Sequence, residues 1–315
     1  MTTKIEWTDE TWNPVTGCSK VSQGCHFCYA ERLWPKVEGS RVKREGGAPR
    51  AFTDVRCHPE RLEAPLHWRT PRRIFVNSMS DLFHDDVPDR FIADVFGVMA
   101  AAPQHQFQIL TKRPMRMWEL LEASKPFIDC VEECAALYTH TDVEWPLANA
   151  WLGVSVEDQA TADERIPLLL QTPAAIRFVS YEPALGPVNF TSYVDPFLVN
   201  HKSRTLARGV RLNWIIAGGE SGTHARPSHP DWFRSARDQC ADAGVAYFFK
   251  QWGEWANSDI QAGFRTDHCF VRRDGTTHSY ADNQQYEASD ALMHRVSKRS
   301  AGRLLDGREH SEYPA

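Results

Sequence analysis

Three cysteines lie close together near the N-terminus of this 315-residue chain. Six residues separate Cys18 from Cys25, and two more separate Cys25 from Cys28. Thiolate sulfur is a soft ligand that suits iron–sulfur clusters and zinc. Three thiolates can hold three corners of a cubane cluster and leave its fourth iron open to a substrate or cofactor, as a catalytic metal site requires. The spacing therefore predicts a [4Fe–4S] site in the loop 17–30.

Structural zinc is the alternative for the same loop, with His26 or Cys57 as the fourth ligand. Structural zinc sites usually take their ligands from two closely spaced pairs, and the sequence offers no second pair of that kind. The cluster is favoured for this reason, and zinc stays open as the second hypothesis.

Composition and charge narrow the class of protein. The formal net charge is -5, which argues against a protein that coats nucleic acid through bulk charge, although a local basic groove stays compatible with it. No stretch approaches eighteen apolar residues, and the N-terminus lacks the apolar core of a signal peptide. We expect a cytoplasmic protein with free thiols and no membrane span.

The elements that must position these cysteines alternate between strands and helices. Helical spacing of apolar residues predicts helices over 88–102 and 231–243. Short apolar runs that suit a buried parallel sheet occur at Arg73–Asn77, Gln106–Thr111, Trp151–Ser155, Ile176–Ser180, Trp214–Gly218 and Ala246–Lys250. Repeated strand–helix units of this kind indicate an α/β fold, and we expect a full or partial (β/α) TIM-like barrel.

Two domains are expected. Residues 1–255 would form the barrel with its cluster loop, and residues 256–315 would form a C-terminal extension. In that extension the sequence predicts a hairpin over 269–277 with an Asp274-Gly275 turn, followed by a helix around 288–296.

Polar residues follow each predicted strand, where barrels of this type place their active sites. Carboxylates, hydroxyls, cations and a glycine pair together favour a functional edge over ordinary solvent-facing strand ends. These residues are Ser78, Ser80 and Asp81, Lys112, Ser155 and Glu157, Tyr181 and Glu182, Gly218, Gly219 and Glu220, and Lys250.

The loop Cys18-x6-Cys25-x2-Cys28-Tyr29-Ala30 on a barrel-like chain resembles the radical S-adenosylmethionine superfamily, although the first gap is longer than the usual three residues. Further motifs along nearly the whole chain resemble the phage Gp37/Gp68 family, a divergent branch of these enzymes known by its three-cysteine motif. These motifs are Trp12-Asn13-Pro14, Asn77-Ser78-Met79-Ser80-Asp81, Leu110-Thr111-Lys112-Arg113-Pro114, Ser180-x-Glu182-Pro183 and Gly218-Gly219-Glu220-Ser221-Gly222.

The resemblance implies a set of roles. Cys18, Cys25 and Cys28 would ligate three irons of a [4Fe–4S] cluster, and S-adenosyl-L-methionine would bind the fourth. The remaining candidates divide between cofactor and substrate. Tyr29, Ser78, Ser80, Asp81, Ser155, Glu157, Gly218, Gly219 and Glu220 would bind the cofactor, and Lys112, Tyr181, Glu182 and Lys250 would act on the substrate.

The resemblance also implies a function, in which a 5′-deoxyadenosyl radical serves nucleic-acid base repair or modification. Its implied partners are a nucleic acid, an electron donor such as a flavodoxin or ferredoxin, and a family partner protein. Two alternatives stay open: a radical enzyme acting on a small molecule or protein, and a non-catalytic, zinc-stabilised nucleic-acid-binding protein. Cations that could contact phosphate are Lys112, Arg113, Arg204, Arg208, Arg211, Arg226, Arg295, Lys298, Arg299 and Arg303.

Overall fold

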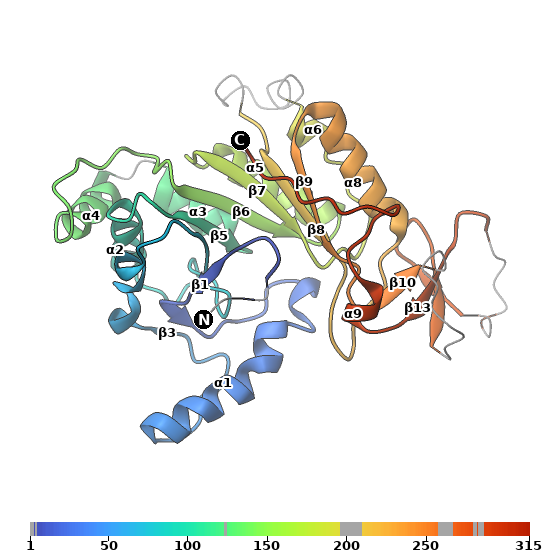
Figure 1. Cartoon of the computed structure of the whole chain (residues 1–315), viewed down its shortest axis with the longest axis horizontal. Coiled ribbons are helices and arrows are strands. Elements are labelled where there is room, and N and C mark those ends of the chain that lie inside the picture. Colours follow the sequence, from blue (N-terminus) through green and yellow to red (C-terminus); the bar gives the residue numbers. More distant parts are fainter. Residues whose placement is uncertain are drawn as a thin grey trace. The chain divides into compact units, whose positions relative to one another are not determined.

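A computed structural model describes residues 3, 5–122, 125–195, 210–257, 267–279, 282 and 287–315 (Figure 1). Arg204 and Arg208, two of the candidate phosphate contacts, lie outside the described residues. The chain divides into two compact units. Unit 1 contains Met1–Val154 and Pro167–Arg177, and unit 2 contains Ser155–Ile166 and Phe178–Ala315.

Seven strands form one sheet in the order β1-β4-β5-β6-β7-β8-β9. Their bounds are Glu10–Trp12 for β1, Arg73–Val76 for β4, Gln106–Thr111 for β5, Ala150–Val156 for β6, Ile176–Tyr181 for β7, Trp214–Gly218 for β8 and Ala246–Gln251 for β9. The described pairings between them are all parallel. The α/β fold predicted from the sequence is confirmed, in the form of a partial (β/α) barrel.

Two smaller sheets are antiparallel. The strand pair of β2 (Val15–Thr16) and β3 (Arg56–Cys57) lies in unit 1. A four-stranded sheet in unit 2 has the order β10-β13-β11-β12, with bounds Trp255–Asn257, Ala291–Arg295, His268–Val271 and Thr277–His278.

Helices connect most of the parallel strands. The α-helices in the described ranges are α1 (Tyr29–Glu45), α2 (Asp89–Ala100), α3 (Pro114–Leu121), α4 (Lys125–Ala135), α5 (Gln159–Gln171), α6 (Thr191–Val194), α8 (Pro230–Ala243) and α9 (Lys298–Ala301). Short 3-10 helices occur at η1 (Gln23–Cys25), η2 (Pro59–Arg61) and η3 (Ala64–His67). No helix in the described part of the chain is long and apolar enough to cross a bilayer.

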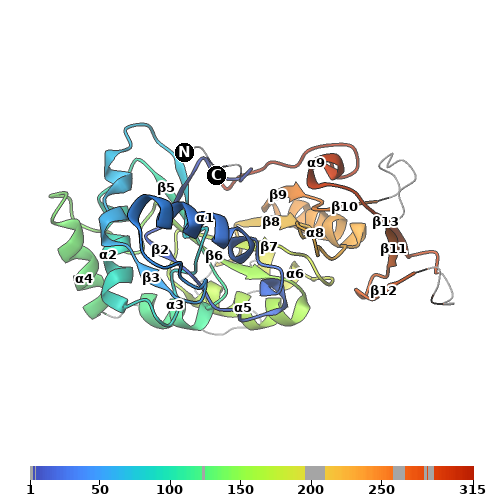
Figure 2. The same ribbon diagram turned by 90° about the horizontal axis from the view of Figure 1, so that it is seen from below.

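Unit 1 is organised around β4 and β5. Val76 lies opposite Ile109, and Thr111 lies opposite Val154, so the carboxyl ends of β4, β5 and β6 lie side by side. Helix α2 presents a buried apolar face that packs beside α4, where the Phe96 and Phe127 ring centroids are 6.0 Å apart (Figures 1 and 2).

Unit 2 is organised around β8, whose five residues are all buried. Tyr181 of β7 lies opposite Ala217, and Gly218 lies opposite Gln251 of β9 after a register shift between Ala217 and Gly218. Helix α8 begins with Pro230 and ends before Gly244, which adopts a left-handed φ of 61° as a C-terminal cap.

The structure confirms all six strand predictions, both helix predictions and the hairpin over 269–277. The helix predicted around 288–296 is wrong, because Ala291–Arg295 forms strand β13. Its backbone pairs with β10 on one side and β11 on the other, and this tertiary pairing outweighs local helix propensity. Strand β1 is an addition that the sequence reading missed.

Candidate functional site

The cysteine loop of unit 1 is fixed to the sheet by its first residues. The Gly17 amide donates to the Met79 carbonyl at 3.2 Å, and the Cys18 amide donates to the Phe52 carbonyl at 2.9 Å. Gly17 has a φ of +92°, and a Cβ there would lie 2.6 Å from the Asp54 carbonyl oxygen. Only glycine therefore fits this position, and the approach of the chain to Cys18 is set by the backbone.

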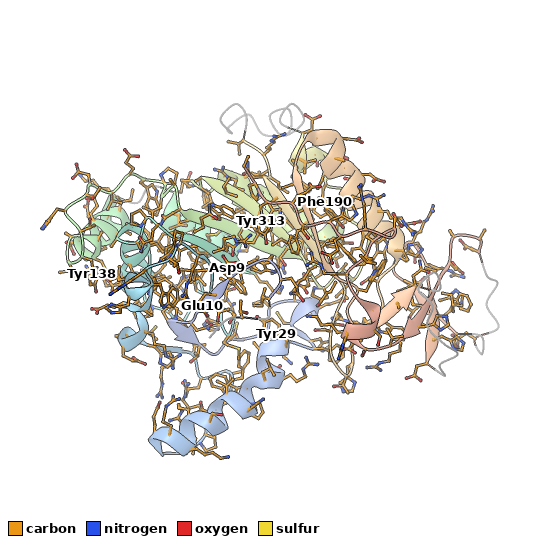
Figure 3. All side chains as sticks on the ribbon, viewed as in Figure 1. Asp9, Glu10, Tyr29, Tyr138, Phe190 and Tyr313 are labelled. Carbon is orange, nitrogen blue, oxygen red and sulfur yellow. The ribbon has the colours of Figure 1, made fainter. Side chains whose placement is uncertain are left out.

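The other two cysteines border helices. Cys25 ends η1, and Cys28 occupies the N-cap of α1. The first amides of an α-helix lack intrahelical partners and carry partial positive charge, which favours anionic sulfur nearby. Tyr29, at the start of α1 in Figure 3, donates its hydroxyl to the Ser78 carbonyl at 2.5 Å and so ties the helix to the turn after β4.

The turn after β4 holds the cysteine loop from the other side. Ser78 Oγ and the Met79 amide both donate to Asn13 Oδ1 at 3.1 Å, and Ser80 Oγ donates to the Val15 carbonyl at 2.9 Å. Asn77, with a left-handed φ of 62°, accepts from the Val15 amide through Oδ1 at 3.2 Å. The hydroxyls expected to bind the methionine end of the cofactor thus secure the loop in this structure.

Asp81 is the centre of a buried polar cluster. Its Oδ1 accepts from Thr111 Oγ1 at 2.8 Å, and its Oδ2 accepts from the Lys112 amide at 3.0 Å and from Arg113 Nη1 at 3.3 Å. The Asp81 carboxylate follows β4. Its partners are Thr111, the last residue of β5, and the two residues after it, so the parallel pairing of β4 and β5 brings them together. Asp81 and Lys112, which were assigned to the cofactor and to the substrate, are in contact here through the backbone amide of Lys112.

Arg113 links this cluster to the cysteine loop. Its Nη1 lies 3.8 Å from Cys18 Sγ, and its Nη2 donates to Ser19 Oγ at 2.8 Å. His84 Nε2 lies 2.8 Å from the same Ser19 hydroxyl. Burial raises the pKa of the Cys18 thiol to about 11, the Asp81 carboxylate adds to the increase, and the Arg113 guanidinium opposes it.

The donor chemistry of the loop fits a soft metal centre. Cys18, Cys25 and Cys28 are free thiols that are each half-buried. No group of three or more His, Cys, Asp or Glu side chains in the described ranges is gathered closely enough to hold a metal ion, so the three thiols do not surround a common metal position in this structure. Of the two residues considered as a fourth zinc ligand, Cys57 lies in β3 and the His26 ring stacks on that of Phe27.

A second polar cluster lies at the strand ends of unit 2. Lys250 Nζ donates to both oxygens of Glu182 at 2.9 and 2.8 Å, and Gln251 Nε2 donates to Glu182 Oε1 at 3.1 Å. Glu182 follows β7 and Lys250 belongs to β9, with β8 between them. Gly218 ends β8 beside them, and a Cβ there would lie in ordinary van der Waals contact with Glu182 Oε1, at 3.4 Å. The Lys250 and Glu182 side chains are 15% and 19% exposed.

The glycine pair has a structural reason that was not foreseen. A Cβ at Gly219 would overlap the Trp252 carbonyl oxygen, because the Gly219 amide donates to the Gln251 carbonyl at 2.9 Å and brings the two chains into contact. The close approach that was expected for a ligand is made here by the protein's own backbone.

Two glycine-to-alanine substitutions should therefore have opposite effects on the free energy of unfolding. Gly219→Ala should lower it by about 1–3 kcal/mol or more, because the added methyl group must displace backbone. Gly39→Ala, in the middle of α1 with nothing within 4 Å of its Cβ position, should raise it by about 0.5–1 kcal/mol. Urea denaturation followed by circular dichroism measures both, and equal stability of the two variants would contradict the contact.

Two other predicted cofactor residues are engaged in ion pairs within unit 2. Glu157, almost fully buried, lies 3.2 and 3.3 Å from Arg165 Nη1, which also donates to the Ser155 carbonyl at 2.8 Å. Glu220 accepts from Arg226 at both oxygens, at 2.7 and 2.8 Å. Arg165 and Arg226 were not foreseen as partners, because no local pattern links them to carboxylates eight and six residues away.

Tyr181 is completely buried, and its hydroxyl donates to the Gly186 carbonyl. Burial raises its pKa well above the ordinary value for tyrosine. In this structure the side chain packs against Phe190, with ring centroids 5.6 Å apart, and offers no surface to a substrate.

Several of the predicted phosphate contacts have partners inside the protein. Arg113 and Arg226 bond carboxylates, as described above, and Arg211 donates to the Ala243 carbonyl at 2.7 Å. Two other candidates, Lys298 and Arg299, are exposed in α9, and further exposed cations lie on α1 at Arg32 and Lys36.

The fold and these polar strand ends define an α/β protein with a cysteine-rich N-terminal loop. The chain belongs to a family described as "Protein of unknown function (DUF5131)", which matches residues 2–314. This is the Gp37/Gp68-like phage family that the sequence motifs predicted. Among solved structures, a mutant of spore photoproduct lyase is similar with a TM-score of 0.42 and 11% identity over 77% of this chain and 76% of that one. None of the curated proteins matches the sequence.

Proposed function

We propose that this protein is a radical S-adenosylmethionine enzyme whose [4Fe–4S] cluster is held by Cys18, Cys25 and Cys28. The observation that carries the proposal is the arrangement of three free thiols on one anchored loop, with a guanidinium directed at the first of them. When bound, the reduced cluster and S-adenosylmethionine would supply a 5′-deoxyadenosyl radical that removes a hydrogen atom from the substrate. The electron would come from a small redox protein such as a flavodoxin or ferredoxin.

The chain's own residues then have distinct tasks. Asn13, Ser78 and Ser80 hold the loop against the sheet, so that closing around a metal costs less chain entropy than it would in a free loop. Lys250 and Glu182 form a partly exposed pair that can orient a polar substrate or move a proton at the Lys250 Nζ atom. Ser155 and Glu157 were expected to bind the ribose hydroxyls, but Glu157 is almost fully buried against Arg165 in this structure.

We favour a nucleic-acid base as the substrate. Aromatic and apolar side chains are exposed at Phe27 and Tyr29, near the end of the cysteine loop, and at Leu33, and the cations Arg32 and Lys36 lie close to them in the sequence. Exposed rings beside cations suit a single strand, because bases stack on the rings and phosphates pair with the charges. This local surface is compatible with a chain whose net charge is -5.

Anaerobic reconstitution with iron and sulfide tests the proposal. We expect a brown protein with about four irons per chain. With dithionite and S-adenosylmethionine it should release 5′-deoxyadenosine, and a single-stranded oligonucleotide should increase that release. A colourless protein with one zinc would overturn the proposal in favour of the zinc-stabilised binding protein. Cleavage that responds to small metabolites or peptides, but not to the oligonucleotide, would contradict the substrate assignment alone.

A further inference from the structure

Arg113 joins the predicted cluster ligand Cys18 to the buried polar network around Asp81 at the sheet edge. Among the described residues of unit 1, it is the one side chain seen to do so. Its side chain is 9% exposed, and that of its partner Asp81 is 8% exposed. The guanidinium uses separate nitrogens for separate tasks, because Nη1 reaches Cys18 and Asp81 while Nη2 reaches Ser19.

The rigidity of this arrangement comes from the ends of β4 and β5. The Arg113 amide donates to Thr111 Oγ1 at 2.8 Å, and that hydroxyl donates to Asp81, so the backbone and the side chain of Arg113 are fixed by the same carboxylate. Arg113 is also the N-cap of α3, which limits its backbone freedom. A planar, pre-organised fork of this kind directs hydrogen bonds better than a flexible ammonium does.

We propose that Arg113 is a positioning residue that hydrogen-bonds the Cys18 sulfur and raises the reduction potential of the cluster bound there. This inference rests on the proposed function. A hydrogen bond to a ligating sulfur withdraws electron density from the metal, and a nearby positive charge stabilises the more negative, reduced form of the cluster. Asp81 holds the guanidinium in place, and its negative charge partly offsets the positive charge of Arg113. The sulfur itself is contacted by Arg113.

The test is the midpoint potential of the reconstituted cluster, followed by electron paramagnetic resonance during a redox titration. Arg113→Met keeps a long unbranched side chain but removes the charge and the donors. At a fixed potential, the ratio of reduced to oxidised cluster should fall at least tenfold. For one electron, a tenfold change is a shift of the midpoint potential by about 59 mV to more negative values. Arg113→Lys keeps the charge but cannot bond Cys18 and Ser19 together, so its shift should be smaller and in the same direction.

Arg56→Met is the matched control, because Arg56 is an exposed arginine of β3 in the same unit that pairs with Asp54 at 3.9 Å. Its potential should equal that of the unmodified protein. An unchanged potential in Arg113→Met and Arg113→Lys, with about four irons bound, would overturn this inference and leave the cluster assignment intact. An equal shift in Arg56→Met would overturn it too, because the effect would then come from overall charge. Failure of the unmodified protein to bind iron would instead refute the proposed function.

Discussion

Cys25→Ser should lower the iron content of the reconstituted protein from about four per chain to below about one, and should remove the release of 5′-deoxyadenosine. Cys25 lies at the end of η1, between the anchored Cys18 and the helix that begins after Cys28. A serine hydroxyl is a hard, poorly ionised ligand and does not replace a thiolate on iron. Iron analysis and chromatography of the reaction products measure the two effects.

Two control variants make this result specific. Cys130→Ser removes a half-buried thiol of α4 and should leave iron content unchanged. Cys57→Ser removes the thiol that the zinc alternative would use as a fourth ligand, and it should also leave iron content unchanged. A loss of metal in Cys57→Ser as large as that in Cys25→Ser would mean a closed four-ligand site, which has no open position for S-adenosylmethionine.

Arg165→Met should lower the free energy of unfolding by about 3–5 kcal/mol. The Arg165 and Glu157 side chains are 3% and 1% exposed, so removing the arginine leaves a carboxylate buried without its cation. The Ser155 carbonyl, which accepts from Arg165 at 2.8 Å, loses a partner as well. Urea denaturation followed by circular dichroism measures the loss.

The double variant Glu157→Leu with Arg165→Met separates the cost of an unpaired charge from the value of the pair. Replacing both partners of a buried ion pair by apolar residues is often close to neutral. We therefore expect the double variant to be more stable than Arg165→Met alone. If the two variants were equally unstable, the pair would be needed for packing and the unpaired charge would be a minor cost.

The sequence predicted those parts of the fold that local patterns determine. Six strands are recognisable because their apolar runs are continuous and buried, and α8 is recognisable because Pro230 and Gly244 mark its ends. Strand β1 is only three residues long, Glu10–Trp12, and is defined by its pairing with β4. Strand β13 was predicted as a helix for a related reason, since its two neighbours in the sheet decide its conformation.

The same distinction applies to the candidate site. The cysteine spacing and the polar strand ends are local features, so they were found from the sequence. The partners of Asp81, Glu157 and Glu220 are set by the three-dimensional packing, which no spacing rule specifies. Arg113 shows the limit most clearly. From the sequence it was a possible phosphate contact, whereas its guanidinium reaches a cysteine 95 residues earlier in the chain.

The position of Cys28 at the N-cap of α1 connects the third sulfur to a distant anchor. The helix is held on its inner side by Trp34 and by Glu38, which accepts from Arg41 at 2.7 and 2.9 Å and from the Arg50 amide at 2.9 Å. Glu38 is ten residues from Cys28, or about 15 Å along the helix axis. Glu38 is therefore a point at which a substitution remote from the cysteines would change the position of the third sulfur through the helix backbone.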